Sequence, residues 1–156
     1  LTQGPGSRIM SLRDGSAKMS KSDPSDNSRL NLLDDEDAIA QKVRKARTDP
    51  EPLPETLDEL KGRPEAENLL GIYAALDGRT AAEVLSEFAG QGFGAFKPKL
   101  ADLAVARLGP VGTEMRRLMA DPAQIDAVLA KGAERARAAA APTLAEVRTK
   151  VGFWGA

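Results

Sequence analysis

The chain has 156 residues, a formal net charge of −1 and hydrophobic residues at 42% of its positions, which fits one globular domain or one domain with an appendage. Cysteine and histidine are both absent, so disulfides, thiolate chemistry, serine–histidine triads and histidine-based zinc sites are excluded. There is no run of about 18 apolar residues, so the sequence predicts no membrane span.

Residues 1–33 are rich in glycine, serine, aspartate and proline, which is typical of irregular structure. We predict a loop segment here, with at most one short strand over residues 8–12. The segment contains the run Lys18-Met19-Ser20-Lys21-Ser22. Lysine ammonium groups and serine hydroxyls bind phosphate oxygens, and a lysine on its flexible stem can follow a phosphate that moves during a reaction. The run therefore indicates a mobile nucleotide-phosphate loop, although it is also compatible with a plain solvated loop.

Helical patterns begin after this segment. The first helix is predicted over about residues 34–47, because acidic residues fill its first turn and basic residues its last, which complements the helix dipole. Several prolines then stop the helix, and residues 48–63 form an acidic, proline-rich connection. The second helix is predicted to open at Pro64, where the missing N–H costs nothing, and to end at Gly78.

The rest of the chain continues the helical pattern. Thr80 and Glu83 are spaced as a capping box for a short third helix. A fourth helix is predicted from about Gly94, with Gly109-Pro110 kinking or ending it. A last long helix is predicted to be interrupted at Pro142. The sequence thus predicts an all-α domain, a helical bundle of about five or six helices, preceded by an irregular N-terminal segment.

The run from Lys18 to Ser22 resembles the signature loop of class I aminoacyl-tRNA synthetases. Its surroundings are similar to bacterial tryptophanyl-tRNA synthetase in particular. The similar segments are spread over the chain and comprise residues 8–12, 22–25, 42–49, 68–73, 92–97 and 132–136. The loop alone indicates only the class, whereas the spread of the other segments favours the tryptophan enzyme over its tyrosine-specific relative.

The resemblance implies a division of the chain and an activity. Residues 1–33 would be the end of the nucleotide-binding catalytic domain, and residues 34–156 would be the helical domain that recognises the tRNA anticodon. The family uses ATP with Mg²⁺ to form tryptophanyl-adenylate and then transfers tryptophan to tRNA(Trp). The intact enzyme would be a cytoplasmic homodimer with no membrane association.

The resemblance also implies roles for single residues. Lys18 and Lys21 would be catalytic and hold the pyrophosphate part of ATP. The ATP-binding set would comprise Ile9, Lys18, Met19, Ser20, Lys21 and Ser22, with Ile9 and Met19 near the adenine ring and Met10 as a neighbour. Basic side chains on the later helices are candidates to bind tRNA, namely Lys97, Lys99, Arg107, Arg116 and Arg117, although such residues usually form a solvated face. No protein-bound metal is expected.

One departure from the family is large. The family carries a nucleotide-binding fold before the signature loop, with a histidine-containing motif and the tryptophan pocket, and no such motif is present here. This implies that the chain is the C-terminal part of a synthetase and is inactive alone. Two alternatives remain open, namely a tyrosyl-tRNA synthetase part and a freestanding helical module that binds RNA or protein.

Overall fold

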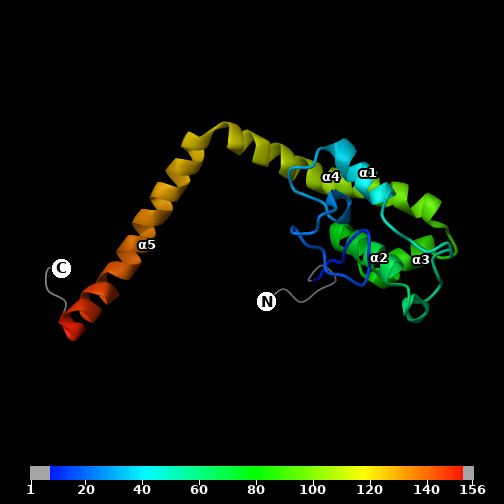
Figure 1. Cartoon of the computed structure of the whole chain (residues 1–156), viewed down its shortest axis with the longest axis horizontal. Coiled ribbons are helices and arrows are strands. Elements are labelled where there is room, and N and C mark those ends of the chain that lie inside the picture. The colour runs from blue at the N-terminus through cyan, green and yellow to red at the C-terminus, as the bar shows by residue number, and fades with distance from the viewer. Residues whose placement is uncertain (1–7, 153–156) are drawn as a thin grey trace. The chain divides into compact units, whose positions relative to one another are not determined.

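A computed structural model of the chain describes residues 8–152 (Figure 1). These residues form two compact units, 8–114 and 115–152. The helices are α1 (Glu36–Arg44), α2 (Pro64–Asp77), α3 (Ala81–Phe88), α4 (Phe93–Ala120) and α5 (Pro122–Val151), with 3-10 turns η1 (Asp26–Ser28) and η2 (Leu57–Leu60). No strand is assigned within residues 8–152, where the possible strand at residues 8–12 is reduced to one antiparallel bridge between Met10 and Lys18. The predicted all-α class with an irregular N-terminal segment is confirmed.

A cluster of aromatic rings holds three helices of the first unit together. Phe96 of α4 is fully buried, and its ring centroid lies 5.0 Å from that of Phe88 on α3 and 5.6 Å from that of Tyr73 on α2. Phe88 and Tyr73 meet edge to face at 5.3 Å. Such arrangements bring the positive edge of one ring to the negative face of another. The aromatic residues within the described part of the chain are therefore concentrated where α2, α3 and α4 meet.

Local capping chemistry sets several helix boundaries as predicted. Thr80 and Glu83 form the expected capping box, in which the Thr80 backbone N–H donates to the Glu83 carboxylate at 2.8 Å and the Glu83 N–H donates to the Thr80 hydroxyl at 3.3 Å. Pro64 opens α2, and Gly78 ends it in the left-handed region with φ 73°. This φ favours glycine because a Cβ would be strained there.

The predicted end of the fourth helix at Gly109-Pro110 and the predicted interruption of the last helix at Pro142 are wrong. α4 continues through Gly109 and Pro110, and α5 continues through Pro142. A proline removes one ladder hydrogen bond and crowds the preceding turn, but strong helix formers on both sides, such as the alanines before Pro142, keep the remaining bonds in place. The structure also adds an element that the pattern did not predict, since η2 lies inside the connection over residues 48–63 and has a capping box between Thr56 and Glu59.

Helix α5 of the second unit, unlike the helices of the first, contains no buried side chains. Val128 and Leu129 keep 68% and 63% of their surface exposed. Nothing in residues 8–152 forms a helix that is both long and apolar enough to cross a membrane.

Candidate functional site

The lysine run is presented by a small hairpin over residues 9–19. Ser11 N–H donates to the Ala17 carbonyl at 2.8 Å, and Met19 N–H donates to the Ile9 carbonyl at 3.1 Å. These bonds place Met10 and Lys18 directly opposite each other. Lys18 therefore lies near the end of the second arm of the hairpin. Its side chain is exposed, and it is the first residue of the run that is predicted to bind phosphate.

A turn of four residues follows the hairpin. Asp23 N–H donates to the Ser20 carbonyl at 3.3 Å, and Ser22 N–H donates to the Ser20 hydroxyl oxygen at 3.2 Å. Lys21 lies inside this turn with an exposed side chain. The Ser20 oxygen acts as an acceptor in this bond, so its own O–H proton can still be donated to a ligand. We name the segment from Lys18 to Ser22 the lysine loop.

The two residues expected near adenine share one apolar cavity. Ile9 and Met19 are opposite each other in the hairpin, and both line a cavity of about 260 Å³ together with Leu30, Ile72 and Leu108. Both also pack against the hydrophobic core. Side chains alternate along extended backbone, so this pair lies on the face opposite to Lys18. The hairpin therefore separates an apolar face, which suits a flat ring, from a cationic face.

Helix α2 anchors the hairpin at two points. The side chain of Asn68 binds the backbone of Met10, accepting from its N–H at 2.9 Å and donating to its carbonyl at 3.0 Å. At the hairpin turn, Gly15 lies so close to α2 that a Cβ there would overlap backbone atoms of Pro64 and Glu65. The hairpin thus rests directly on the first half of α2.

The segment after the lysine loop is fixed to α1 by a buried charge. The Lys42 ammonium lies 2.6 Å from both the Asp26 and the Asp34 carboxylates, and its side chain is 6% exposed. Arg29 adds an ion pair with Asp26 at 3.1 Å and donates to the Asp23 carbonyl at 2.8 Å. These contacts hold residues 23–34 in place immediately behind the lysine loop.

The charges of this network shift one another's pKa. Burial disfavours the charged form of Lys42, but its hydrogen bonds to Asp26 and Asp34 outweigh that effect and raise its pKa. The hydrogen bond from Lys42 is the largest cause that lowers the pKa of Asp26, followed by the bond from Asn31. Both shifts favour the ionised pair near neutral pH.

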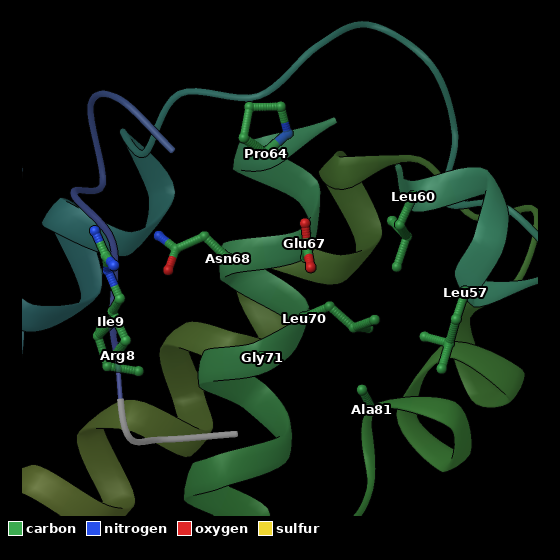
Figure 2. Close-up of a pocket in the computed structure, with 10 residues that line it drawn as sticks. All are labelled: Arg8, Ile9, Leu57, Leu60, Pro64, Glu67, Asn68, Leu70, Gly71 and Ala81. Carbon is green, nitrogen blue, oxygen red and sulfur yellow. The ribbon is translucent and has the colours of Figure 1, made fainter. Parts of the chain in front are cut away.

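A second cavity, of about 330 Å³, lies beside the hairpin (Figure 2). Arg8 and Ile9 line it on one side, and Leu57 and Leu60 of η2 line it on another. Figure 2 shows Asn68 projecting from α2 toward the segment that carries Ile9. In the described part of the chain, no group of three or more histidine, cysteine, aspartate or glutamate side chains is placed so that it could hold a metal ion.

The basic residues expected to bind tRNA lie in different settings. Lys97 is half-buried, its ammonium donates to the Ala46 carbonyl at 2.7 Å, and burial lowers its pKa. Lys99 and Arg107 are exposed on α4. Arg116 and Arg117 are exposed farther along that helix, in the second unit, and Arg117 donates to the Gln124 side chain at 3.0 Å.

The chain is similar to proteins of known function. Residues 2–109 match the family described as tRNA synthetases class I (W and Y). The chain belongs to this family. It is 71% identical to a tryptophan–tRNA ligase of Caulobacter vibrioides over all 156 residues, and 63% identical to one of Rhizobium meliloti over 98% of its length. Both of these relatives are tryptophan–tRNA ligases.

The chain spans about half or less of the length of these relatives, namely 45% of the Caulobacter protein and 43% of the Rhizobium protein. A solved tryptophanyl-tRNA synthetase of Mycoplasma pneumoniae has a TM-score of 0.72 at 26% identity, over 95% of this chain and 46% of that one. The family and the fold of this chain are therefore shown.

Sequence reasoning did not assign a role to three residues that hold the lysine loop, namely Asn68, Gly15 and Lys42. Asn68 lies in one of the segments that resemble the family, and its signal in the sequence is a polar side chain amid the apolar residues of α2. Lys42 lies among the basic residues at the end of the predicted first helix, where nothing in the sequence distinguishes it from its exposed neighbours. A glycine in a loop carries no signal of its own, because its neighbour in space is 49 or more positions away in the sequence.

Proposed function

We propose that the intact protein is a tryptophan–tRNA ligase, which activates tryptophan with Mg²⁺-ATP and transfers it to tRNA(Trp). The observation that carries this proposal is the 71% identity to such a ligase over the full length of the chain. The hairpin supports it, because it presents exposed lysines on one face and an apolar cavity on the other.

The proposed first reaction is an in-line displacement at phosphorus. A carboxylate oxygen of tryptophan attacks the α-phosphorus of ATP, the bond from that phosphorus to the bridging oxygen breaks, and pyrophosphate leaves with Mg²⁺. Negative charge develops on the leaving group, and positioned cations stabilise it. Lys18 and Lys21 would supply these cations, and no proton needs to be removed by a histidine.

The remaining loop residues would orient the nucleotide. Ile9 and Met19 would contact adenine from their shared cavity. Ser20 and Ser22 would donate to phosphate oxygens from the turn that Ser20 holds closed. With residues 1–33 completing the catalytic domain, the loop joins that domain to the helices that follow.

The helical part would bind the anticodon region of tRNA(Trp). Lys99 and Arg107 have exposed side chains that suit phosphate contacts. Arg116 and Arg117 extend this set, and Lys97 would join it while holding the end of α1 through Ala46. We further propose that the intact enzyme is a homodimer in the cytoplasm, as its family resemblance implies.

Tryptophan-dependent exchange of labelled pyrophosphate into ATP tests the activity. The intact protein should catalyse this exchange with tryptophan and not with tyrosine, and it should charge tRNA(Trp). The 156-residue chain alone should catalyse neither step, because the proposed tryptophan pocket lies in another part of the protein. Exchange that depends on tyrosine would support the tyrosine enzyme instead. If the intact protein catalyses no exchange but binds RNA, the result would favour a freestanding RNA-binding module.

A further inference from the structure

The Asn68 side chain makes three hydrogen bonds to the backbone of the hairpin. Asn68 Oδ1 accepts from Met10 N–H at 2.9 Å, while its Nδ2 donates to the Met10 carbonyl at 3.0 Å and to the Ser11 carbonyl at 3.3 Å. The residue is only 8% exposed. One carboxamide therefore satisfies a backbone donor and two backbone acceptors that lie 57 or 58 positions away in the sequence.

The hairpin geometry explains why a carboxamide fits here. The bonds between Ser11 and Ala17 and between Met19 and Ile9 flank the Met10–Lys18 pair. In such a pair, the N–H and C=O of Met10 point away from the opposite arm and need another partner. Asn68 takes the place of a third strand at this position. An aspartate would put an anionic oxygen against two carbonyls, and an aliphatic residue would leave three polar groups without partners.

Asn68 is itself held rigidly. Its neighbours Leu69 and Leu70 are each 1% exposed, and Ala66 is fully buried. Because α2 packs through the aromatic cluster into the core, the carboxamide is a fixed reference point. Met10 lies directly opposite Lys18, so a displacement of Met10 also displaces the first lysine of the loop.

We propose that Asn68 is a positioning residue for the ATP-dependent step, because it sets the place from which Lys18 and the lysine loop approach the phosphates. This inference rests on the proposed function. Asn68 touches neither nucleotide nor tryptophan in this scheme, and it acts only through the backbone of Met10. Its loss should therefore affect adenylate formation and leave the later transfer to tRNA unchanged.

The test compares Asn68→Ala with Thr80→Ala in the intact ligase. Thr80→Ala removes the α3 capping box and destabilises the same unit without touching the hairpin. The rate of tryptophan-dependent pyrophosphate exchange is measured per active site, titrated by the burst of ATP consumption. Asn68→Ala should lower this rate about ten- to hundredfold, because small displacements of catalytic groups have effects of that size. Thr80→Ala should stay near the wild-type rate, and transfer from preformed adenylate to tRNA should be unchanged in both variants.

Asn68→Asp provides a second, isosteric readout. The introduced carboxylate keeps an acceptor for Met10 N–H but faces two carbonyl oxygens in a buried place, which raises its pKa. When protonated, it can again donate to one carbonyl. The deficit in exchange should therefore shrink as the pH falls from about 8 to about 6, whereas the deficit of Asn68→Ala should stay constant relative to wild type.

The outcomes distinguish the positioning role of Asn68 from the proposed function. Wild-type protein without tryptophan-dependent exchange overturns the proposed function. If wild type is active, exchange per active site within about twofold of wild type in Asn68→Ala and Asn68→Asp overturns the positioning role. A proportional fall of exchange and transfer in Asn68→Ala also overturns it, because that pattern indicates general damage to the fold.

Discussion

Two kinds of lysine stand close together in this sequence and have opposite surroundings. Lys18 and Lys21 in the lysine loop are exposed. The Lys42 side chain is 6% exposed and lies 2.6 Å from each of two carboxylates. The first pair keeps its charge available for a ligand, whereas Lys42 uses its charge to fix the segment behind the loop. Residue type alone therefore does not tell a binding cation from a structural one.

The lysine loop lies between two supported segments. The loop is held by turn bonds through Ser20, while the regions on both sides of it are tied to helices. Asn68 of α2 holds the hairpin before the loop, and Lys42 of α1 holds the segment after it. Fixed ends on both sides would allow a short loop to close over a ligand without disturbing the core.

The largest effect is expected from the exposed lysines. In the intact ligase, Lys18→Ala and Lys21→Ala should each lower the rate of tryptophan-dependent exchange about 100- to 1,000-fold, which is the usual cost of removing one charge-stabilising group. Their melting temperatures should equal that of the wild type, because exposed side chains contribute little to stability. Lys45→Ala, which changes an exposed lysine on the end of α1, serves as the control. If Lys18→Ala and Lys21→Ala lowered the melting temperature and left exchange unchanged, these lysines would be structural and not catalytic.

The next effect concerns the closest approach of the hairpin to α2. Gly15→Ala should lower the free energy of unfolding by about 3 kcal/mol, because the added Cβ meets backbone atoms that cannot rotate away. Gly71→Ala is the matched control, since a Cβ there meets nothing within 4 Å and should stabilise α2 by about 0.5–1 kcal/mol. Urea denaturation followed by circular dichroism measures both. Equal stability of the two variants would contradict the close contact.

A smaller loss is expected from the buried cation. Lys42→Met should lower the free energy of unfolding by about 2 kcal/mol, because Asp34 is left poorly hydrated without its partner. Lys45→Met on the end of the same helix should change it by less than about 0.5 kcal/mol. Urea denaturation of the chain distinguishes the two. Similar values for both variants would mean that Lys42 is as solvated as the loop lysines.

The smallest effect is a dependence on pH. Burial raises the pKa of Asp49, but its hydrogen bonds from Arg63, at 2.6 and 3.1 Å, outweigh this and lower the pKa below 3.8. A lowered folded-state pKa stabilises the fold above the unfolded pKa, and this contribution is lost as the pH falls through the folded value. Between about pH 5 and about pH 3, the melting temperature of the wild type should fall more steeply than that of Asp49→Asn. Parallel slopes would show that Arg63 does not hold the ionised form.

The helices and their ends were largely predictable, because capping residues and prolines act within one turn of the chain. Thr80, Pro64 and Gly78 each have the expected role. The continuity of α4 through Pro110 and of α5 through Pro142 was not predictable, since it depends on whether the surrounding helix outweighs one missing bond. The roles of Lys18 and Lys21 toward ATP remain predictions from the motif.

The sequence by itself determined the all-α class, the family and the segment that carries the lysine run, because each of these depends on local pattern or on a short motif. Only the tertiary structure decided how that segment is held. The contacts of Asn68 with Met10 join residues 58 positions apart, and those of Lys42 with Asp26 join residues on either side of a loop. Such pairs are chosen by the packing of the folded chain, and no local preference of either residue specifies its partner.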